Sequence, residues 1–342
     1  MKRILAALLA SISLFSMVGC GSKTESGTGE AGTPAPVEEK NVTLKIGFQA
    51  NAGSNEEAAA QLLAQKANEY SNGTITVEIF PGGQLGDDRA MIDQVAAGAL
   101  DMTYSETGRL GLWEPELEIF GYPFAFDDYD HLIRTLNETE YGKTINEKLE
   151  ARGWIILADA YNGTRHTTTN KAINSIEDMK GLKLRVPNAA ANLAFAEYSG
   201  AAATPMPFAE VYLALKTNAV DGQENPLSTI DAQKFYEVQP YCALTGHIIN
   251  DNNYIISKIV YDKLSPAQQE AITKATVEAA EFHTNKFIED EQALLEKFEE
   301  MGVTITTPDK AAFREACAPM YDEYVAKFGD AAVKAIEEAR SK

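Results

Sequence analysis

Two arginines and an asparagine are the residues of this chain best suited to hold a small anion. Arg165 follows an Asn-Gly turn signal, Arg185 stands two positions before a proline, and Asn225 directly precedes another proline. Such positions deliver side chains to strand ends, where open α/β sheets bind ligands. A guanidinium donates two parallel hydrogen bonds to a carboxylate, and an amide both donates and accepts. The pattern therefore predicts a carboxylate site. The structural alternatives are a surface ion pair for an arginine in a strand and a turn for the asparagine.

Motifs of catalysis are missing from the sequence, which contains no GxSxG, HExxH, Walker A or GxGxxG pattern. The four histidines have no partner at a ligand or base spacing, and we expect them to be surface or structural residues: His131, His166, His247 and His283. A carboxylate pair of the glycosidase type stays open, because acidic residues are plentiful and none stands out. We therefore expect no catalytic residue, metal or cofactor, and an enzyme is the weaker hypothesis.

The composition is that of a globular protein with an acidic surface. The chain has 342 residues, 45% of them hydrophobic and 23% charged, with a formal net charge of −20. That length allows two domains, each with its own core. The charge argues against nucleic acid as a partner, because phosphate binding needs a basic surface. An anionic ligand must then be attracted by individual arginines rather than by the protein as a whole.

The N-terminus has the pattern of an export signal. Lys2 and Arg3 precede a mostly apolar stretch over 4–18, which is short for a membrane span of about 20 residues. The stretch ends in Met-Val-Gly-Cys20, which resembles a lipoprotein signal, so we expect 1–20 to be the signal peptide and Cys20 to be lipidated. A plain secretory signal is the alternative. Residues 21–40 are rich in Gly, Ser, Thr, Pro and Glu, which predicts a flexible tether.

Two further cysteines, Cys242 and Cys317, leave two alternatives open. In an exported protein they can form a disulfide. They can equally be two buried free thiols, because sequence gives no distance between them.

The rest of the chain alternates strands and helices, which predicts an α/β fold with a largely parallel sheet. The longest helix is expected over 266–301, where its apolar pattern would extend about 54 Å and reach across both domains. The alternation starts again after Asn162-Gly163, as two similar lobes would require. The expected strands are 42–49, 74–80, 100–105 and 182–186, and the other expected helices are 54–70, 87–97, 175–181, 188–199 and 208–216.

The segments around the anion-binding candidates, YNGTRHTTTN, GLKLRVPN and DGQENP, resemble the solute-binding proteins of TRAP transporters, the DctP family. Within that family the chain is most similar to members that capture sialic acid. The resemblance runs from about Leu44 to the C-terminus. It implies a two-lobed periplasmic-binding-protein-like fold, with a ligand cleft between the lobes and a long helix spanning both. Lobe I would be 41–162 plus about 251–290, and lobe II 163–250 plus about 291–342.

The resemblance also implies roles for individual residues. Arg185 would form the main salt bridge to the ligand carboxylate, with Arg165 and Asn225 beside it. Further ligand contacts carry over to positions in both lobes: Asp88, Glu106, Arg109, Asn188 and Phe208. Without the family, Asp88 is a first-turn helix residue, Glu106 a loop acid and Phe208 a core residue. The sialic-acid binders have an asparagine where this chain has Gln49, which is one methylene longer.

These observations favour an extracytoplasmic, lipid-anchored solute-binding protein. We expect it to be monomeric, to capture a sugar acid such as N-acetylneuraminate, and to deliver it to the TRAP membrane permease. It would touch the membrane through its lipid anchor only and bind no nucleic acid. The alternatives are the same fold binding a hexuronate or an aldonate, an exported hydrolase of acidic sugars, and a receptor that presents its ligand to a signalling protein.

Overall fold

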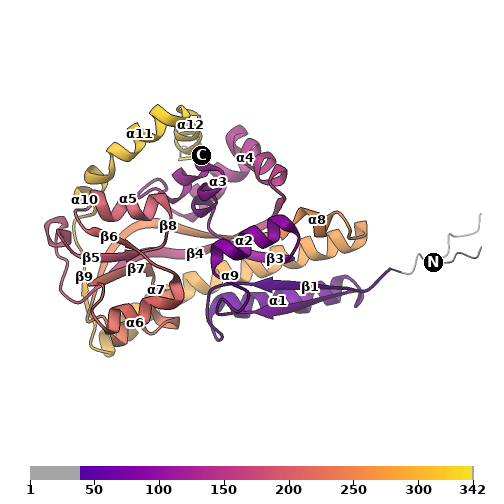
Figure 1. Ribbon diagram of the computed structural model, residues 1–342, viewed down its shortest axis with the longest axis horizontal. Coiled ribbons are helices and arrows are strands. Elements are labelled where there is room, and N and C mark those ends of the chain that lie inside the picture. Colours follow the sequence, from indigo (N-terminus) through magenta and orange to yellow (C-terminus); the bar gives the residue numbers. More distant parts are fainter. Residues whose placement is uncertain (1–38, 341–342) are drawn as a thin grey trace, which may run out of the picture. The chain divides into compact units, whose positions relative to one another are not determined.

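The computed structural model describes residues 39–340, in which Glu39 and the residues after it form one compact unit (Figure 1). The predicted signal peptide, Cys20 and the predicted tether up to residue 38 lie outside the described residues.

The described strands form one nine-stranded sheet in the order β2-β1-β3-β8-β4-β7-β5-β6, with β9 paired to β8. The strands are β1 (Val42–Gly47), β2 (Ile75–Phe80), β3 (Met102–Ser105), β4 (Trp154–Thr169), β5 (Lys183–Val186), β6 (Ala202–Pro205), β7 (Gly222–Pro226), β8 (Tyr241–Ser257) and β9 (Thr304–Thr306).

Two long antiparallel strands, β4 and β8, form the centre of the sheet. On one side β1 pairs in parallel with β2 and β3, and on the other β5 pairs in parallel with β6 and β7. Figure 1 shows these two groups toward opposite ends of β4 and β8. The predicted α/β class and its parallel units are therefore confirmed. The long central pair was not predicted, because the Asn162-Gly163 turn signal and the β-bulges of β4 interrupt its alternation.

Helices cover the sheet. They are α1 (Asn55–Tyr70), α2 (Asp88–Ala97), α3 (Tyr129–Glu138), α4 (Glu140–Ala151), α5 (Ala190–Tyr198), α6 (Val211–Lys216), α7 (Leu227–Ala232), α8 (Lys258–Tyr261), α9 (Pro266–Glu300), α10 (Lys310–Cys317), α11 (Pro319–Phe328) and α12 (Ala331–Arg340). The 3₁₀ turns are η1 (Thr107–Leu112), η2 (Pro115–Gly121), η3 (Ile176–Met179), η4 (Phe208–Glu210) and η5 (Phe235–Glu237). Two helices expected from the sequence are shorter than predicted: 175–181 contains only η3, and 208–216 starts as η4 before becoming α6.

The long helix α9 extends over nearly the whole predicted range. Its first half buries Ile272 and Ala279 against β1 and α1, in the same core as Leu44. Its second half buries Leu294 and Phe298 in a separate core formed with α6 and α7. One helix therefore stabilises the packing on both sides of β4 and β8, as the two-lobed fold requires.

The C-terminal helix packs far from the strands that precede it. The ring of His131 on α3 bonds to the carbonyl of Ile336 at 2.8 Å, and Arg134 donates to the carbonyl of Ala339 at 3.0 Å. The end of predicted lobe II thus rests on a helix of predicted lobe I. The boundaries of the two lobes remain a prediction.

Both cysteines in the described region are buried and free, which matches the second of the two alternatives. Cys242 lies in the core of α6 and α7, and Cys317 in the core around α5. None of the helices within 39–340 is both long enough and apolar enough to cross a membrane.

Candidate ligand-binding site

A pocket of about 480 Å³ lies at the ends of the strands that flank the central pair. One wall comes from the segment after β1, the start of α2 and the end of β3. The other comes from the ends of β5, β6 and β7 and from α7. All nine residues predicted to contact a ligand line this pocket: Gln49, Asp88, Glu106, Arg109, Arg165, Arg185, Asn188, Phe208 and Asn225. The structure brings them together, while their contact with a ligand stays a prediction.

The local setting of Arg165 differs from the expected strand-end loop. Arg165 lies inside β4, opposite Pro226 of β7. The predicted Asn162-Gly163 turn is instead an irregularity between Tyr161 and Thr164, through which the strand continues. Gly163 has φ of +89°, and a Cβ there would meet the Pro226 side chain at 2.7 Å. Only glycine fits this close crossing of two strands.

Arg185 is a buried cation with no acidic partner. Its side chain is 2% exposed, and its guanidinium donates to the carbonyl of Met206, from Nη2 at 2.7 Å and from Nε at 3.2 Å. Within the described residues, no carboxylate lies at ion-pair distance from it. Burial, with smaller effects from the neighbouring Arg165 and Arg109, lowers the pKa of Arg185 to about 9, although the Glu224 carboxylate partly offsets this shift. Its remaining donors are available to an anion in the pocket.

Arg165, in contrast, is already paired with Glu224. Its Nη2 donates to the Glu224 carboxylate and to the Glu224 carbonyl, both at 2.8 Å, and its Nε also donates to the carboxylate. The Nη1 group points to Asn250 at 3.4 Å and to Glu106 at 4.0 Å. Arg165 is therefore held rigidly at the pocket wall, and fewer of its donors can turn to a ligand.

Glu224 was missed by the sequence analysis, although it lies in the DGQENP segment beside Asn225. Its side chain is fully buried. Burial alone would raise its pKa, but Arg165 and the His247 ring outweigh burial and lower the pKa of Glu224 to about 2. His247 Nε2 lies 3.2 Å from this carboxylate, and Asn192 donates to it at 3.2 Å.

All four histidines are buried, so each has a structural setting rather than a surface one.

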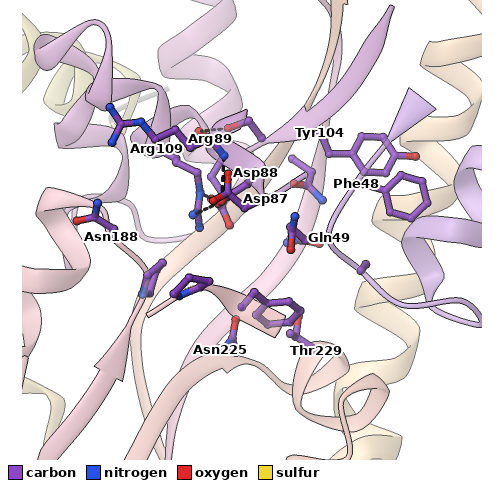
Figure 2. Close-up of a pocket in the computed structure, with 18 of the residues that line it drawn as sticks. Phe48, Gln49, Asp87, Asp88, Arg89, Tyr104, Arg109, Asn188, Asn225 and Thr229 are labelled. Carbon is purple, nitrogen blue, oxygen red and sulfur yellow. Dashed lines mark hydrogen bonds and ion pairs between the residues drawn. The ribbon is translucent and has the colours of Figure 1, made fainter. Parts of the chain in front are cut away.

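On the opposite wall, three predicted residues form their own ion-pair network. Arg109 bonds both to Asp88 and to Glu106, and Figure 2 shows the Arg109 and Asp88 side chains joined at the pocket wall. Burial raises the pKa of Glu106, but Arg109 and Arg165 outweigh it and hold the pKa below its usual value. Glu106 therefore stays ionised. The free lone pairs of both carboxylates can accept hydrogen bonds from hydroxyl groups.

The polar amides around the pocket are oriented by neighbouring groups. Gln49 donates to the carbonyl of Gly86 at 2.8 Å, which leaves its oxygen as an acceptor. Asn225 accepts from Arg165 at 3.2 Å and donates to Gln223 at 2.5 Å. Figure 2 shows Asn188 across the pocket from the rings of Phe48 and Tyr104.

Aromatic side chains supply the apolar surfaces of the pocket. Phe48 and Tyr104 stack with ring centroids 5.0 Å apart. Phe208 is half-buried, lies 5.9 Å from the Arg185 guanidinium, and packs edge-on against Phe235 at 6.3 Å. It thus has a core contact as well as a face on the pocket. A site with a buried cation that has no carboxylate of residues 39–340 at ion-pair distance, together with carboxylates, amides and ring faces, suits a monoanion that carries hydroxyl groups.

Comparison with known proteins gives matches over most of the chain. The model of the family "Bacterial extracellular solute-binding protein, family 7" (DctP) matches residues 46–327. The sialic acid-binding periplasmic protein SiaP of Vibrio cholerae is 49% identical over 288 residues, which cover 84% of this chain and 89% of SiaP.

Solved structures agree with this match. The sugar acid binding protein DctPAm of Advenella mimigardefordensis, in complex with galactonate, has a TM-score of 0.84 at 32% identity and covers 89% of this chain and 99% of its own. A TRAP periplasmic solute-binding protein of Citrobacter koseri with bound D-glucuronate has a TM-score of 0.81 at 29% identity, covering 86% of this chain and 99% of its own. These relatives are binding proteins of transporters and not enzymes. The chain belongs to the DctP family of extracytoplasmic TRAP solute-binding proteins.

Proposed function

We propose that this protein captures N-acetylneuraminate outside the cytoplasm and delivers it to a TRAP permease. The observation that carries the proposal is Arg185, a buried guanidinium that faces the pocket without an acidic partner in the described chain. A ligand carboxylate would supply the missing charge through two parallel hydrogen bonds. The ionised carboxylates of the facing wall exclude a second negative charge there.

The polar remainder of a sialic acid fits the other groups of the pocket. Asp88 and Glu106 would accept hydrogen bonds from hydroxyl groups, and Gln49 and Asn188 would contact amide or hydroxyl groups. Phe208 would pack beneath the sugar ring. The relative with 49% identity is named for sialic acid, which favours this ligand among the sugar acids.

A hexuronate or an aldonate is the second candidate, because related structures hold D-glucuronate and galactonate. Such ligands share the carboxylate but lack the N-acetyl and glycerol groups. They would leave some buried polar groups of the pocket unpaired, at about 1–3 kcal/mol each. We therefore expect N-acetylneuraminate to bind at least about 100-fold more tightly.

Isothermal titration calorimetry with N-acetylneuraminate, glucuronate and galactonate tests this selectivity. Stoichiometric binding without product formation is expected for N-acetylneuraminate. Tighter binding of glucuronate or galactonate would reject sialic acid as the ligand and leave the transport role intact. Arg152→Ala is a suitable control, because Arg152 forms an exposed ion pair with Glu114 outside the pocket.

The proposal includes attachment to the membrane through a lipid on Cys20. The Met-Val-Gly-Cys20 sequence directly follows the apolar segment of the export signal. Two acyl chains give stable attachment, whereas one binds only marginally. A tether over 21–40 would then leave the binding unit free to approach the permease.

A further inference from the structure

We propose that Asp251, which does not line the pocket, is a positioning residue for the half of the site formed by Glu106 and Arg109. The inference rests on the proposed function, since it assigns a role in sugar-acid binding. Asp251 lies on the central strand β8 and is 2% exposed.

Hydrogen bonds join Asp251 to the residue that follows Glu106. The backbone N–H of Thr107 donates to both carboxylate oxygens of Asp251, at 3.1 and 3.3 Å. The Thr107 hydroxyl also donates to Asp251, at 2.5 Å. These contacts span 144 positions in the sequence, so a central strand fixes the turn at which β3 ends.

That turn determines where the side chains of two predicted ligand-binding residues, Glu106 and Arg109, point. Glu106 is the residue before η1, and its carbonyl accepts from the backbone N–H of Arg109 at 3.0 Å. A shift of Thr107 would therefore move the Glu106 and Arg109 side chains together. Shifts of about 1 Å at a binding site are enough to cost much of its affinity.

The charges around Asp251 indicate that pairing with a cation is not its role. Within the described chain, no basic side chain lies at ion-pair distance from Asp251. The groups that face it are Asp159 on β4, Glu106 at the end of β3 and Tyr129 on α3. Arg109 and Arg165 line a small cavity to which Asp251 and Glu106 also contribute.

Because Asp251 is buried and faces Asp159, its pKa is raised to about 7, and it gains a proton as the pH falls from 8 to 6. A protonated Asp251 has one acceptor fewer for Thr107 and Asn253, which donates to the same carboxylate at 3.1 Å. The carboxylate of the ligand stays ionised over this range.

The test measures N-acetylneuraminate affinity by calorimetry in wild-type protein, Asp251→Ala and Asp251→Asn. We expect Asp251→Ala to bind about 10- to 100-fold more weakly. Asparagine keeps one acceptor for the Thr107 N–H, as protonated Asp251 does, so Asp251→Asn at pH 8 should bind about as weakly as wild type at pH 6 and more tightly than Asp251→Ala. Wild-type affinity should fall between pH 8 and pH 6, and that of Asp251→Asn should change less.

A non-additive double variant separates positioning from general damage to the fold. If Asp251 acts in part through Glu106, Asp251→Ala should weaken binding by a smaller factor in a Glu106→Gln background than in the wild-type background. Asp101→Ala is the matched control, because Asp101 accepts from a strand N–H, that of Lys45, at 2.7 Å and lies away from the pocket. It should lower the melting temperature without changing the affinity.

Each outcome decides the inference. Unchanged affinity in folded Asp251→Ala, or full additivity with Glu106→Gln, would overturn it while leaving sugar-acid binding in place. If Asp251→Ala does not fold, an Asp251→Asn variant with the same pH profile as wild type overturns it equally. A wild-type protein that binds none of the sugar acids overturns the proposed function and this inference together.

Discussion

Replacing Arg185 by methionine should strongly weaken ligand binding and, at the same time, stabilise the unliganded protein. Methionine fills a similar volume without a charge. Arg185 has no acidic partner in residues 39–340, so burial of its charge opposes folding. Burial lowers its pKa to about 9, and each pKa unit below the ordinary value of a guanidinium corresponds to about 1.36 kcal/mol. The charge therefore costs at most about 4–5 kcal/mol of stability.

The direction of this stability change follows from the linkage between proton binding and folding. A base whose pKa is lower in the folded state binds its proton less well there, so the cost is fully present at pH 7 and is relieved only above about pH 9. The variant also loses two hydrogen bonds to the Met206 carbonyl, worth about 1–3 kcal/mol together. A net gain of about 1–4 kcal/mol corresponds to a melting temperature roughly 2–12 °C higher.

The same substitution at Arg165 should destabilise the protein instead, and it serves as the matched comparison. Arg165→Met would leave the Glu224 carboxylate buried without its main cation. Breaking one partner of a buried pair costs about 3–5 kcal/mol, or roughly 6–15 °C.

Differential scanning calorimetry of both unliganded variants at pH 7 measures these shifts, and titration with N-acetylneuraminate measures binding. We expect the affinity of Arg185→Met to fall ~30- to several thousand-fold. A lower melting temperature for unliganded Arg185→Met would refute the view that this arginine is an uncompensated charge. Measurable binding within a few-fold of wild type would mean that the carboxylate binds elsewhere.

Two further predictions concern Glu224 and Cys20. Glu224→Gln should lower the free energy of unfolding by several kcal/mol at pH 7. Because the pKa of Glu224 is lowered from 4.5 to about 2, its contribution to stability should be complete above about pH 5 and be lost as the pH falls through 4.5 toward 2. The melting temperatures of the variant and the wild type should therefore converge near pH 2, and a difference that stays constant with pH would contradict the assignment. Cys20→Ser should release the exported protein from the membrane fraction and block lipid attachment, which fractionation and mass spectrometry would show. A variant that stays membrane-bound and is processed at the same site would exclude Cys20 as the anchor.

The sequence led to most of the pocket residues through the resemblance of short, local motifs to those of the DctP family. The Arg185 segment, for example, predicts a strand that ends before a proline, and β5 ends at Val186. Sequence reasoning did not find Glu224, because the pairing of Glu224 with Arg165 depends on the register of β7 against β4. The length of β4 was also missed, since an Asn-Gly pair predicts a turn more often than a bulge inside a strand. In both cases the structure depends on a contact between segments that are far apart in the sequence, and local patterns do not predict such contacts.

The distribution of charge in the pocket explains how a protein with a net charge of −20 can bind an anion. Arg109 pairs with Asp88 and Glu106, and Arg165 pairs with Glu224 and, at 4.0 Å, with Glu106. Among residues 39–340, Arg185 in contrast has no carboxylate at ion-pair distance. We therefore expect a ligand carboxylate to bind at the Arg185 end of the pocket, because the ionised Glu106 at the other end repels it. This uneven pairing would then determine both where the anion binds and how the sugar is oriented.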